Sequence, residues 1–418
     1  MGWNSWDAYG TTVNEAQVRA NAVWMAAHLK PAGWTYVVVD MEWFVENPAA
    51  QGGSKTNRFA IDEHGRYLPA VNRFQSAAGG AGFAPLAAYV HGLGLKFGIH
   101  ILQGVPKVAA AGAGTIQGGD LRLADAANTA GTCPWNFDNY DVKDGAAGQA
   151  YYDSLMRMYA VWGVDLIKVD CIASRPYKGA EIAMVARAIG KTGRPMLLSL
   201  SPGEAPIERL EEMRGEAAMW RISDDVWDLW HSDVSYPQGL GDQIARLAKW
   251  AGKATPGHWP DADMLPLGQL GPAPGWGKAR ATRLSHDEQR TLLTLWSMFR
   301  SPLMMGGELT QTDAWTEALL TNQEVLAVNQ ASTENRPVDA GAGLAVWVAR
   351  HGGTRYVAVV NTTEAARVVE IPFAKLGWGG GRFRMRDLWE RKDAGVAGSL
   401  KATLAPHACV LYGAEVVR

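Results

Sequence analysis

The hydrophobic pattern of roughly the first 200 residues repeats one unit: a segment of helical period, a glycine, and a short apolar strand. A capping-box pattern at Thr12 and Glu15 predicts a first helix that ends near Leu29 and precedes a strand at 36–39. The same alternation then returns three times, with helices at 86–91, 151–162 and 182–189 and strands at 97–100, 166–170 and 196–199.

Further short apolar segments continue this series of strands, at 2–6, 219–223, about 258–264, and 302–305. Nearly continuous apolar strands that alternate with helices are typical of a parallel sheet covered by helices. Eight such strands are the number that closes a (β/α)8 TIM barrel. The alternative is an open doubly wound sheet, which is disfavoured because no GxGxxG opens a helix after a strand. We therefore expect an α/β chain whose residues 1–330 form a TIM barrel.

The pattern changes after about residue 330, where no long helical period remains. Glycine and proline turns separate short β-branched runs, which we expect to be strands at 344–349, 356–360, 368–371, 382–386 and 409–412. This pattern predicts a C-terminal antiparallel β-sandwich over residues 331–418.

Composition excludes several kinds of partner. Lys and Arg number 40 against 42 Asp and Glu, and this balance gives no reason to expect nucleic acid or an anionic membrane as a partner. No apolar run is long enough to span a bilayer, and no signal peptide stands at Met1. The sequence leaves the location open between the cytoplasm and, if an upstream signal has been removed, the periplasm or the exterior. The sequence assigns no oligomeric state.

Acidic residues stand at the carboxyl ends of the predicted strands, where the active sites of TIM barrels lie. They are Asp40, Asp170, Asp224, Asp225, Asp261 and Asp263. A cluster of carboxylates suits either a metal or a carboxylate pair. The nine His residues form no HxxxH or HxH pair and the three Cys form no CxxC, so we expect neither a metal nor any other cofactor.

Strand parity favours the carboxylate pair. Lys168 and Asp170 lie two residues apart, so their side chains point to the same face, where the ammonium group would keep the carboxylate ionised for nucleophilic attack. Arg221 and Asp225 share parity in the same way, whereas Asp224 has the opposite parity. Each pair alone is more often a structural salt bridge. Together, at the ends of different strands in a chain with 18 Trp, they point to glycoside hydrolysis by two carboxyl groups.

Several segments of the predicted barrel resemble, in order, the signature segments of glycoside hydrolase family 27, the α-galactosidase and α-N-acetylgalactosaminidase family. They are MGWNSW at 1–6, LIKVD at 166–170, WRISDD at 220–225, WPDADML at 259–265 and SPLM at 301–304. The resemblance implies a TIM barrel with a C-terminal β-sandwich and a retaining exo-glycosidase that cleaves galactose-configured sugars from an oligosaccharide or glycoside. It also implies roles for individual residues: Asp170 as the nucleophile, Asp225 as the general acid/base, Lys168 and Arg221 as ligands of sugar hydroxyls, Trp6 as the aromatic platform, and Asp40 as an acid that binds the far hydroxyls.

The sequence departs from the family pattern where the far end of the sugar would bind. The family's α-galactosidases have a second Asp after the Asp40 position, whereas this chain has Met41, with Glu42 next. A thioether is a weak acceptor, and its bulk would crowd a CH₂OH group. The resemblance therefore favours β-L-arabinopyranose, which has the ring configuration of galactose and no C6. The alternative is that Glu42 restores the galactose contact.

Two further departures leave other choices open. The loop containing Ser201 has small residues where α-galactosidases often have an acidic-aromatic pair, and small residues there suit the 2-acetamido group of an α-N-acetylgalactosaminide. Cys171 directly follows Asp170, in place of the family's Asp-x-Cys, so the resemblance leaves open whether Cys133 and Cys171 form a disulfide. The alternatives of other classes are a non-catalytic carbohydrate-binding barrel and a metal-dependent aldolase or isomerase.

Overall fold

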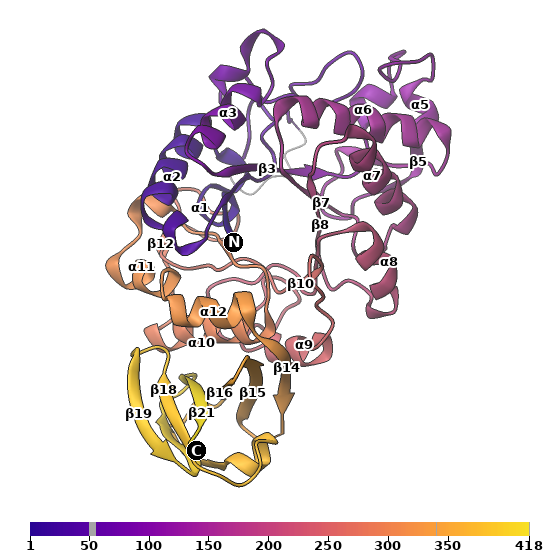
Figure 1. The fold of residues 1–418 in the computed structure, drawn as a ribbon. Coiled ribbons are helices and arrows are strands. Elements are labelled where there is room, and N and C mark those ends of the chain that lie inside the picture. Colours follow the sequence, from indigo (N-terminus) through magenta and orange to yellow (C-terminus); the bar gives the residue numbers. More distant parts are fainter. Residues whose placement is uncertain (50–55, 340, 418) are drawn as a thin grey trace. The chain divides into compact units, whose positions relative to one another are not determined.

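The computed structural model describes residues 1–49, 56–339 and 341–417 (Figure 1). The chain divides into two compact units. The first comprises Met1–Arg221, Gly268–Ala281 and Met304–Thr312, and the second comprises Ile222–Leu267, Thr282–Leu303 and Asp313–Arg418. The expected boundary between residues 330 and 331 stays a prediction.

The first unit is built on a parallel sheet. Its strands lie in the order β9-β8-β7-β3-β2-β1-β13, and every pair with a described register is parallel. They are β1 (Gly2–Asn4), β2 (Tyr36–Val39), β3 (Lys96–Leu102), β7 (Leu166–Asp170), β8 (Leu197–Leu200), β9 (Met219–Arg221) and β13 (Met304–Met305). The eighth parallel strand, β10 (Trp259–Asp261), belongs to the second unit. The fold is a (β/α)8 barrel with a C-terminal β-sandwich, which confirms the predicted fold class.

The helices of the first unit cover the outer side of this sheet (Figure 1). They include α2 (Glu15–His28), α3 (Ala84–Gly92), α6 (Ala146–Trp162) and α7 (Gly179–Thr192). The predicted capping box at Thr12 and Glu15 is wrong, because α2 is capped by Asn14 and Gln17. Thr12 instead ends a 3₁₀ turn and donates its hydroxyl to the carbonyl of Tyr9, so it cannot also cap α2.

A small antiparallel sheet that the sequence did not predict follows β3. It contains β4 (Val105–Pro106), β5 (Ala127–Thr132) and β6 (Asn139–Val142) in the order β4-β6-β5. Residues 133–138 connect β5 to β6, and we call this connection the strap.

The C-terminal part of the second unit is a β-sandwich. A six-stranded antiparallel sheet has the order β14-β15-β16-β21-β18-β19, and β17 pairs with β20 in a second sheet. The strands are β14 (Thr333–Val338), β15 (Leu344–His351), β16 (Thr354–Asn361), β17 (Arg367–Pro372), β18 (Phe383–Asp387), β19 (Lys392–Ala397), β20 (Ser399–Leu404) and β21 (Cys409–Val416). Apolar side chains from both sheets form one core, among them Val357 and Val359 from the first sheet and Val369 and Ile371 from the second.

Candidate active site

Asp40 directly follows β2 and is the centre of a buried polar network. Its Oδ1 lies 2.6 Å from Nδ1 of His100, and its Oδ2 accepts a hydrogen bond of 2.7 Å from the amide of Asn4. The Nζ of Lys168 lies 3.5 Å from the same Oδ2. Burial opposes the ionisation of Asp40, but the charges of His100 and Lys168 and the two hydrogen bonds outweigh it and hold the pKa of this carboxyl far below its usual range. Asp40 is therefore a fixed carboxylate at the end of the strand.

His100 adds a polar group that sequence reasoning missed. It lies on β3 in register with Lys168 on β7, so both residues belong to the same layer of the barrel. Its Nε2 is buried and has no hydrogen-bond partner among the described residues. The signal in the sequence was its place in a predicted apolar strand, where a buried His requires a partner.

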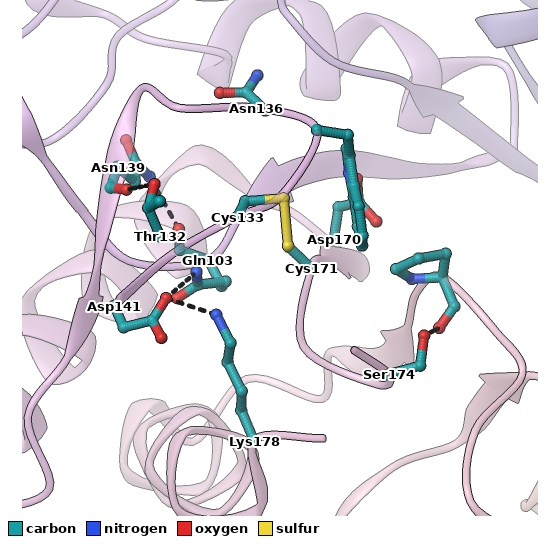
Figure 2. Close-up of a disulfide and its surroundings, with 12 residues drawn as sticks. Gln103, Thr132, Cys133, Asn136, Asn139, Asp141, Asp170, Cys171, Ser174 and Lys178 are labelled. Carbon is teal, nitrogen blue, oxygen red and sulfur yellow. Dashed lines mark hydrogen bonds and ion pairs between the residues drawn. A yellow bond between two sulfur atoms is a disulfide. The ribbon is translucent and has the colours of Figure 1, made fainter. Parts of the chain in front are cut away.

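The backbone amide of Met41 donates a hydrogen bond of 2.9 Å to Oδ1 of Asp40, but the side chain of Met41 lies outside this polar network. Its side chain is 7% exposed and packs in an apolar cluster with Leu102, Cys133 and Cys171. The two cysteines are joined by a disulfide, with a Cα–Cα distance of 5.8 Å (Figure 2). Where the family's α-galactosidases have a carboxylate, this site therefore has an apolar wall formed by a thioether and a disulfide.

Glu42 is buried and hydrogen-bonded to the strap. Its Oε1 accepts a hydrogen bond of 3.0 Å from the side-chain amide of Asn136, and its carbonyl oxygen accepts one of 2.7 Å from the guanidinium group of Arg73. Asn57 lies 3.5 Å from Oε2. The side chain of Glu42 is thus connected to the strap by a hydrogen bond, and its predicted contact with the sugar stays a prediction.

Asp170 is the last residue of β7 and is buried. Its Oδ2 accepts a hydrogen bond of 3.1 Å from the indole Nε1–H of Trp135, a strap residue that sequence reasoning also missed. Its carbonyl oxygen accepts a hydrogen bond of 3.1 Å from the backbone amide of Gln103. Both its backbone and its carboxylate are therefore held in place. Lys168, which parity assigns to Asp170, has a described ion pair with Asp40.

Trp6 begins the short helix α1 (Trp6–Tyr9) and is half-buried. Its ring packs against the backbone of Gly275, where a Cβ atom would approach the ring to 2.3 Å, so only glycine fits at that position. The indole N–H of Trp6 is buried without an acceptor among the described residues. Trp6 therefore combines a flat apolar face with a donor that has no described partner.

Ser201 and Arg221 lie at the ends of β8 and β9. The backbone amide of Ser201 donates to the carbonyl of Val169, and its own carbonyl accepts from the amide of Ile172. Ser201 thereby fixes the turn that follows Asp170. Arg221 is the last residue of β9 and is buried.

The remaining strand-end acids belong to the second unit. The carboxylate of Asp263 accepts a hydrogen bond of 2.7 Å from the amide of Val226, and that of Asp261 accepts one of 2.9 Å from the amide of Asp263. These two acids therefore stabilise the local backbone. Asp224 is buried, whereas Asp225 is half-buried and pairs through its carbonyl with the amide of Gln238. Asp225 is thus the more accessible of the two adjacent acids.

Within the parts of the chain that the structure covers, no three His, Cys, Asp or Glu side chains cluster as a metal site would require. No helix in the same residues is long and apolar enough to cross a membrane.

Both the barrel and the C-terminal β-sandwich match models of known protein families. A family model described as alpha galactosidase A matches residues 139–331, and one described as alpha galactosidase C-terminal beta sandwich domain matches residues 341–414. The crystal structure of a variant of a GH27 β-L-arabinopyranosidase from Geobacillus stearothermophilus, in complex with arabinose, is 45% identical with a TM-score of 0.95, and the match covers 100% of this chain and 97% of that one.

Curated relatives are more distant. Alpha-galactosidase A of Cellvibrio japonicus is 29% identical over 79% of this chain and 67% of its own length. Alpha-N-acetylgalactosaminidase of Gallus gallus is 26% identical over 79% of this chain and 69% of its own length. Both of these relatives carry the names of glycosidases.

Proposed function

Because the chain belongs to glycoside hydrolase family 27 and is a glycosidase, we propose that it is a retaining exo-glycosidase that releases terminal β-L-arabinopyranose in preference to α-D-galactose. The observation that carries this choice of sugar is the packing of Met41 against the disulfide. The arabinopyranosidase named above supports the choice, because its likeness to this chain extends over the whole length.

The end of the sugar that distinguishes the two substrates would lie near Asp40. In an α-D-galactoside, ring carbon C5 carries a CH₂OH group that needs space and a hydrogen-bond partner. In a β-L-arabinopyranoside, C5 carries only hydrogen. The apolar side chain of Met41 offers no strong acceptor to this hydroxyl. Glu42, the alternative acceptor, already accepts a hydrogen bond from Asn136. The carboxylate of Asp40 and the free ring nitrogen of His100 suit the hydroxyls that both sugars share.

In the proposed mechanism Asp170 is the nucleophile. Its carboxylate attacks the anomeric carbon while the bond from that carbon to the aglycone oxygen breaks, and Asp225 gives its proton to the leaving oxygen. Asp225, now a carboxylate, then takes a proton from water as the water oxygen attacks the same carbon. The bond to Asp170 breaks, Asp170 regains its charge, and Asp225 is again protonated. Two inversions at one carbon give net retention.

Other groups in this proposal bind the substrate. Trp6 provides a flat apolar face for the ring, and its N–H can donate to a sugar oxygen. Lys168 and Arg221 bind hydroxyl groups, as the family resemblance implies. Ser201 lies in the small-residue loop that suits a 2-acetamido group, which is the observation that favours α-N-acetylgalactosaminide as a second candidate substrate.

Initial rates on three p-nitrophenyl glycosides test the proposal: the β-L-arabinopyranoside, the α-D-galactopyranoside and the α-N-acetylgalactosaminide. The highest kcat/KM is expected for the arabinopyranoside. A clear preference for the galactoside would assign the far hydroxyl to Glu42, and a preference for the acetamido sugar would assign specificity to the Ser201 loop.

A further inference from the structure

The strap joins two acidic groups of the site through adjacent residues. Trp135 donates its indole N–H to Oδ2 of Asp170, and the next residue, Asn136, donates its side-chain amide to Oε1 of Glu42. The strap thus contacts the ends of both β7 and β2. Neither contact is local in sequence, since they span 35 and 94 residues.

The disulfide ties the strap to the strand that carries Asp170. Cys133 lies two residues before Trp135, and Cys171 directly follows Asp170, so both partners of the Trp135–Asp170 hydrogen bond lie within two residues of the covalent link. A link of this kind limits the relative motion of the two groups and so raises the fraction of time in which they are bonded. The guanidinium group of Arg175 lies 5.5 Å from the centre of the Trp135 ring and adds a further contact.

We propose that Trp135 is a positioning residue for Asp170, held in place by the disulfide, and that it acts mainly in the second half of the reaction. The inference rests on the proposed function, in which Asp170 is the nucleophile. A donor on Oδ2 leaves Oδ1 as the oxygen that bonds to the sugar. It also makes Trp135 the donor that stabilises the negative charge that Asp170 regains when the bond to the sugar breaks.

The two half-reactions respond differently to this donor. In the covalent intermediate Asp170 is an uncharged ester, and it regains its charge as water displaces it. Hydrogen bonds to charged acceptors are stronger than those to neutral ones, so the N–H stabilises the transition state of this step more than the intermediate. In the first step Asp170 loses charge, so the same donor stabilises the free enzyme at least as much as the transition state. Its loss should slow hydrolysis of the intermediate and leave the first step nearly unchanged.

Trp135→Phe removes the N–H and keeps an aromatic ring, and the 39% exposure of Trp135 makes the change compatible with folding. On a 2,4-dinitrophenyl glycoside of the preferred sugar, kcat should fall about ten- to a hundred-fold. KM should fall in parallel, because the intermediate accumulates, so kcat/KM should stay within about threefold. Mass spectrometry of the reacting variant should show the glycosylated protein, with the sugar on the peptide that contains Asp170.

Phe137→Leu is the matched control. Phe137 lies on the same strap and is 64% exposed, and its ring lies 6.0 Å from Nζ of Lys107. The proposed reaction assigns no role to Phe137. Its kinetics should equal those of the wild type. A second readout uses the indole ¹H–¹⁵N signal of Trp135, assigned by its absence in Trp135→Phe. This signal should shift when Asp170→Asn removes the charge that it binds.

The outcomes separate the inference from the proposed function. If a 2-deoxy-2-fluoro glycoside labels the wild type elsewhere than on Asp170, the nucleophile is wrongly assigned and the inference fails with it. If Asp170 is labelled but Trp135→Phe lowers kcat/KM at constant KM without accumulation, Trp135 only shapes the site and the inference alone is overturned. An indole signal of Trp135 that is the same in Asp170→Asn and in the wild type would also contradict the positioning role of Trp135.

Discussion

Asp40 shows how a single buried carboxylate organises its surroundings. It is nearly inaccessible to solvent and is bonded to His100, Asn4 and Lys168, so its ionised form stabilises three polar or charged partners at once. Removing one partner of a buried ion pair leaves the other charge without compensation, which costs more than the pair contributes.

Asp40→Asn should therefore lower the free energy of unfolding by about 3–5 kcal/mol at pH 7. Because the folded-state pKa of Asp40 is depressed, its contribution is complete above the ordinary Asp pKa of about 3.9 and is lost as the pH falls below that value. Urea unfolding at pH 7 and pH 3 measures this, and the deficit should be smaller at pH 3. Asp144→Asn, at an exposed position, is the control. An equal deficit at both pH values would contradict the assignment.

Met41→Asp restores the acceptor of the family's α-galactosidases. The ratio of kcat/KM for the α-D-galactoside to that for the β-L-arabinopyranoside should rise about ten- to a hundred-fold, the value of a hydrogen bond to a charged group. The thermal midpoint should fall, because the new carboxylate is placed among Leu102 and the disulfide. Met41→Leu keeps the apolar volume and should keep the wild-type ratio. A ratio that Met41→Asp leaves unchanged would transfer the role to Glu42.

For single residues, the sequence indicated the acids at strand ends but missed His100, which lies within β3, and Trp135, which lies on the strap. Asp40, Lys168 and Asp170 were recognisable because strands have a period of two and end at the same edge of the sheet. Trp135 was not, because its contact with Asp170 depends on the path of the strap, for which local pattern gives no signal.

The strap depends on the elements that support it. β6 continues from the strap and is bonded to α7, since the backbone amide of Val142 donates to Oε1 of Glu181 and the hydroxyl of Tyr152 donates to Oε2. Beside them Nζ of Lys178 lies 2.5 Å from Oδ1 of Asp141. Burial raises the pKa of Glu181 to about 7, although the hydrogen bond from Tyr152 and the charge of Lys178 act in the opposite direction.

The raised pKa of Glu181 determines the direction in which the stability of the protein changes with pH. The native state binds the proton more tightly than the unfolded chain, so this group reduces stability as the pH rises from about 4.5 to about 7. Glu181→Gln removes this dependence. Its unfolding free energy relative to the wild type should increase by about 2–3 kcal/mol between pH 5 and pH 8. Chemical denaturation at both pH values is the measurement, with the exposed Glu208→Gln as control. A constant difference would show that Glu181 is ionised throughout this range.

Elements were predictable where their own pattern determines them. The strands 36–39 and 166–170 were placed at their observed bounds because their apolar runs are short and end at Asp. β5, β19 and β20 were missed because each is polar or contains glycine and is stabilised by pairing with another strand. The capping box of α2 was misplaced by two residues because Asn14 and Thr12 are both good caps, and only tertiary structure selects one.

At the scale of the whole molecule, the proposed mechanism requires two carboxyl groups with different tasks, on Asp170 and on Asp225. Asp225→Ala should lower kcat/KM about 10²- to 10⁴-fold for glycosides with poor leaving groups and much less for activated aryl glycosides, which do not need protonation. Azide should restore part of its kcat on activated substrates. Asp224→Ala is the matched control at the adjacent residue, and this pattern in Asp224→Ala but not in Asp225→Ala would reverse the assignment.

The central claim is a retaining hydrolysis of β-L-arabinopyranosides, and the anomeric form of the first product tests it most directly. Proton NMR of p-nitrophenyl β-L-arabinopyranoside, recorded in the first minutes after addition of enzyme, distinguishes the two anomers before they equilibrate. We predict that β-L-arabinopyranose appears first and that the α-anomer grows in only by mutarotation. The α-anomer as first product, or no hydrolysis of this substrate by an enzyme that cleaves the α-D-galactoside, would contradict the account.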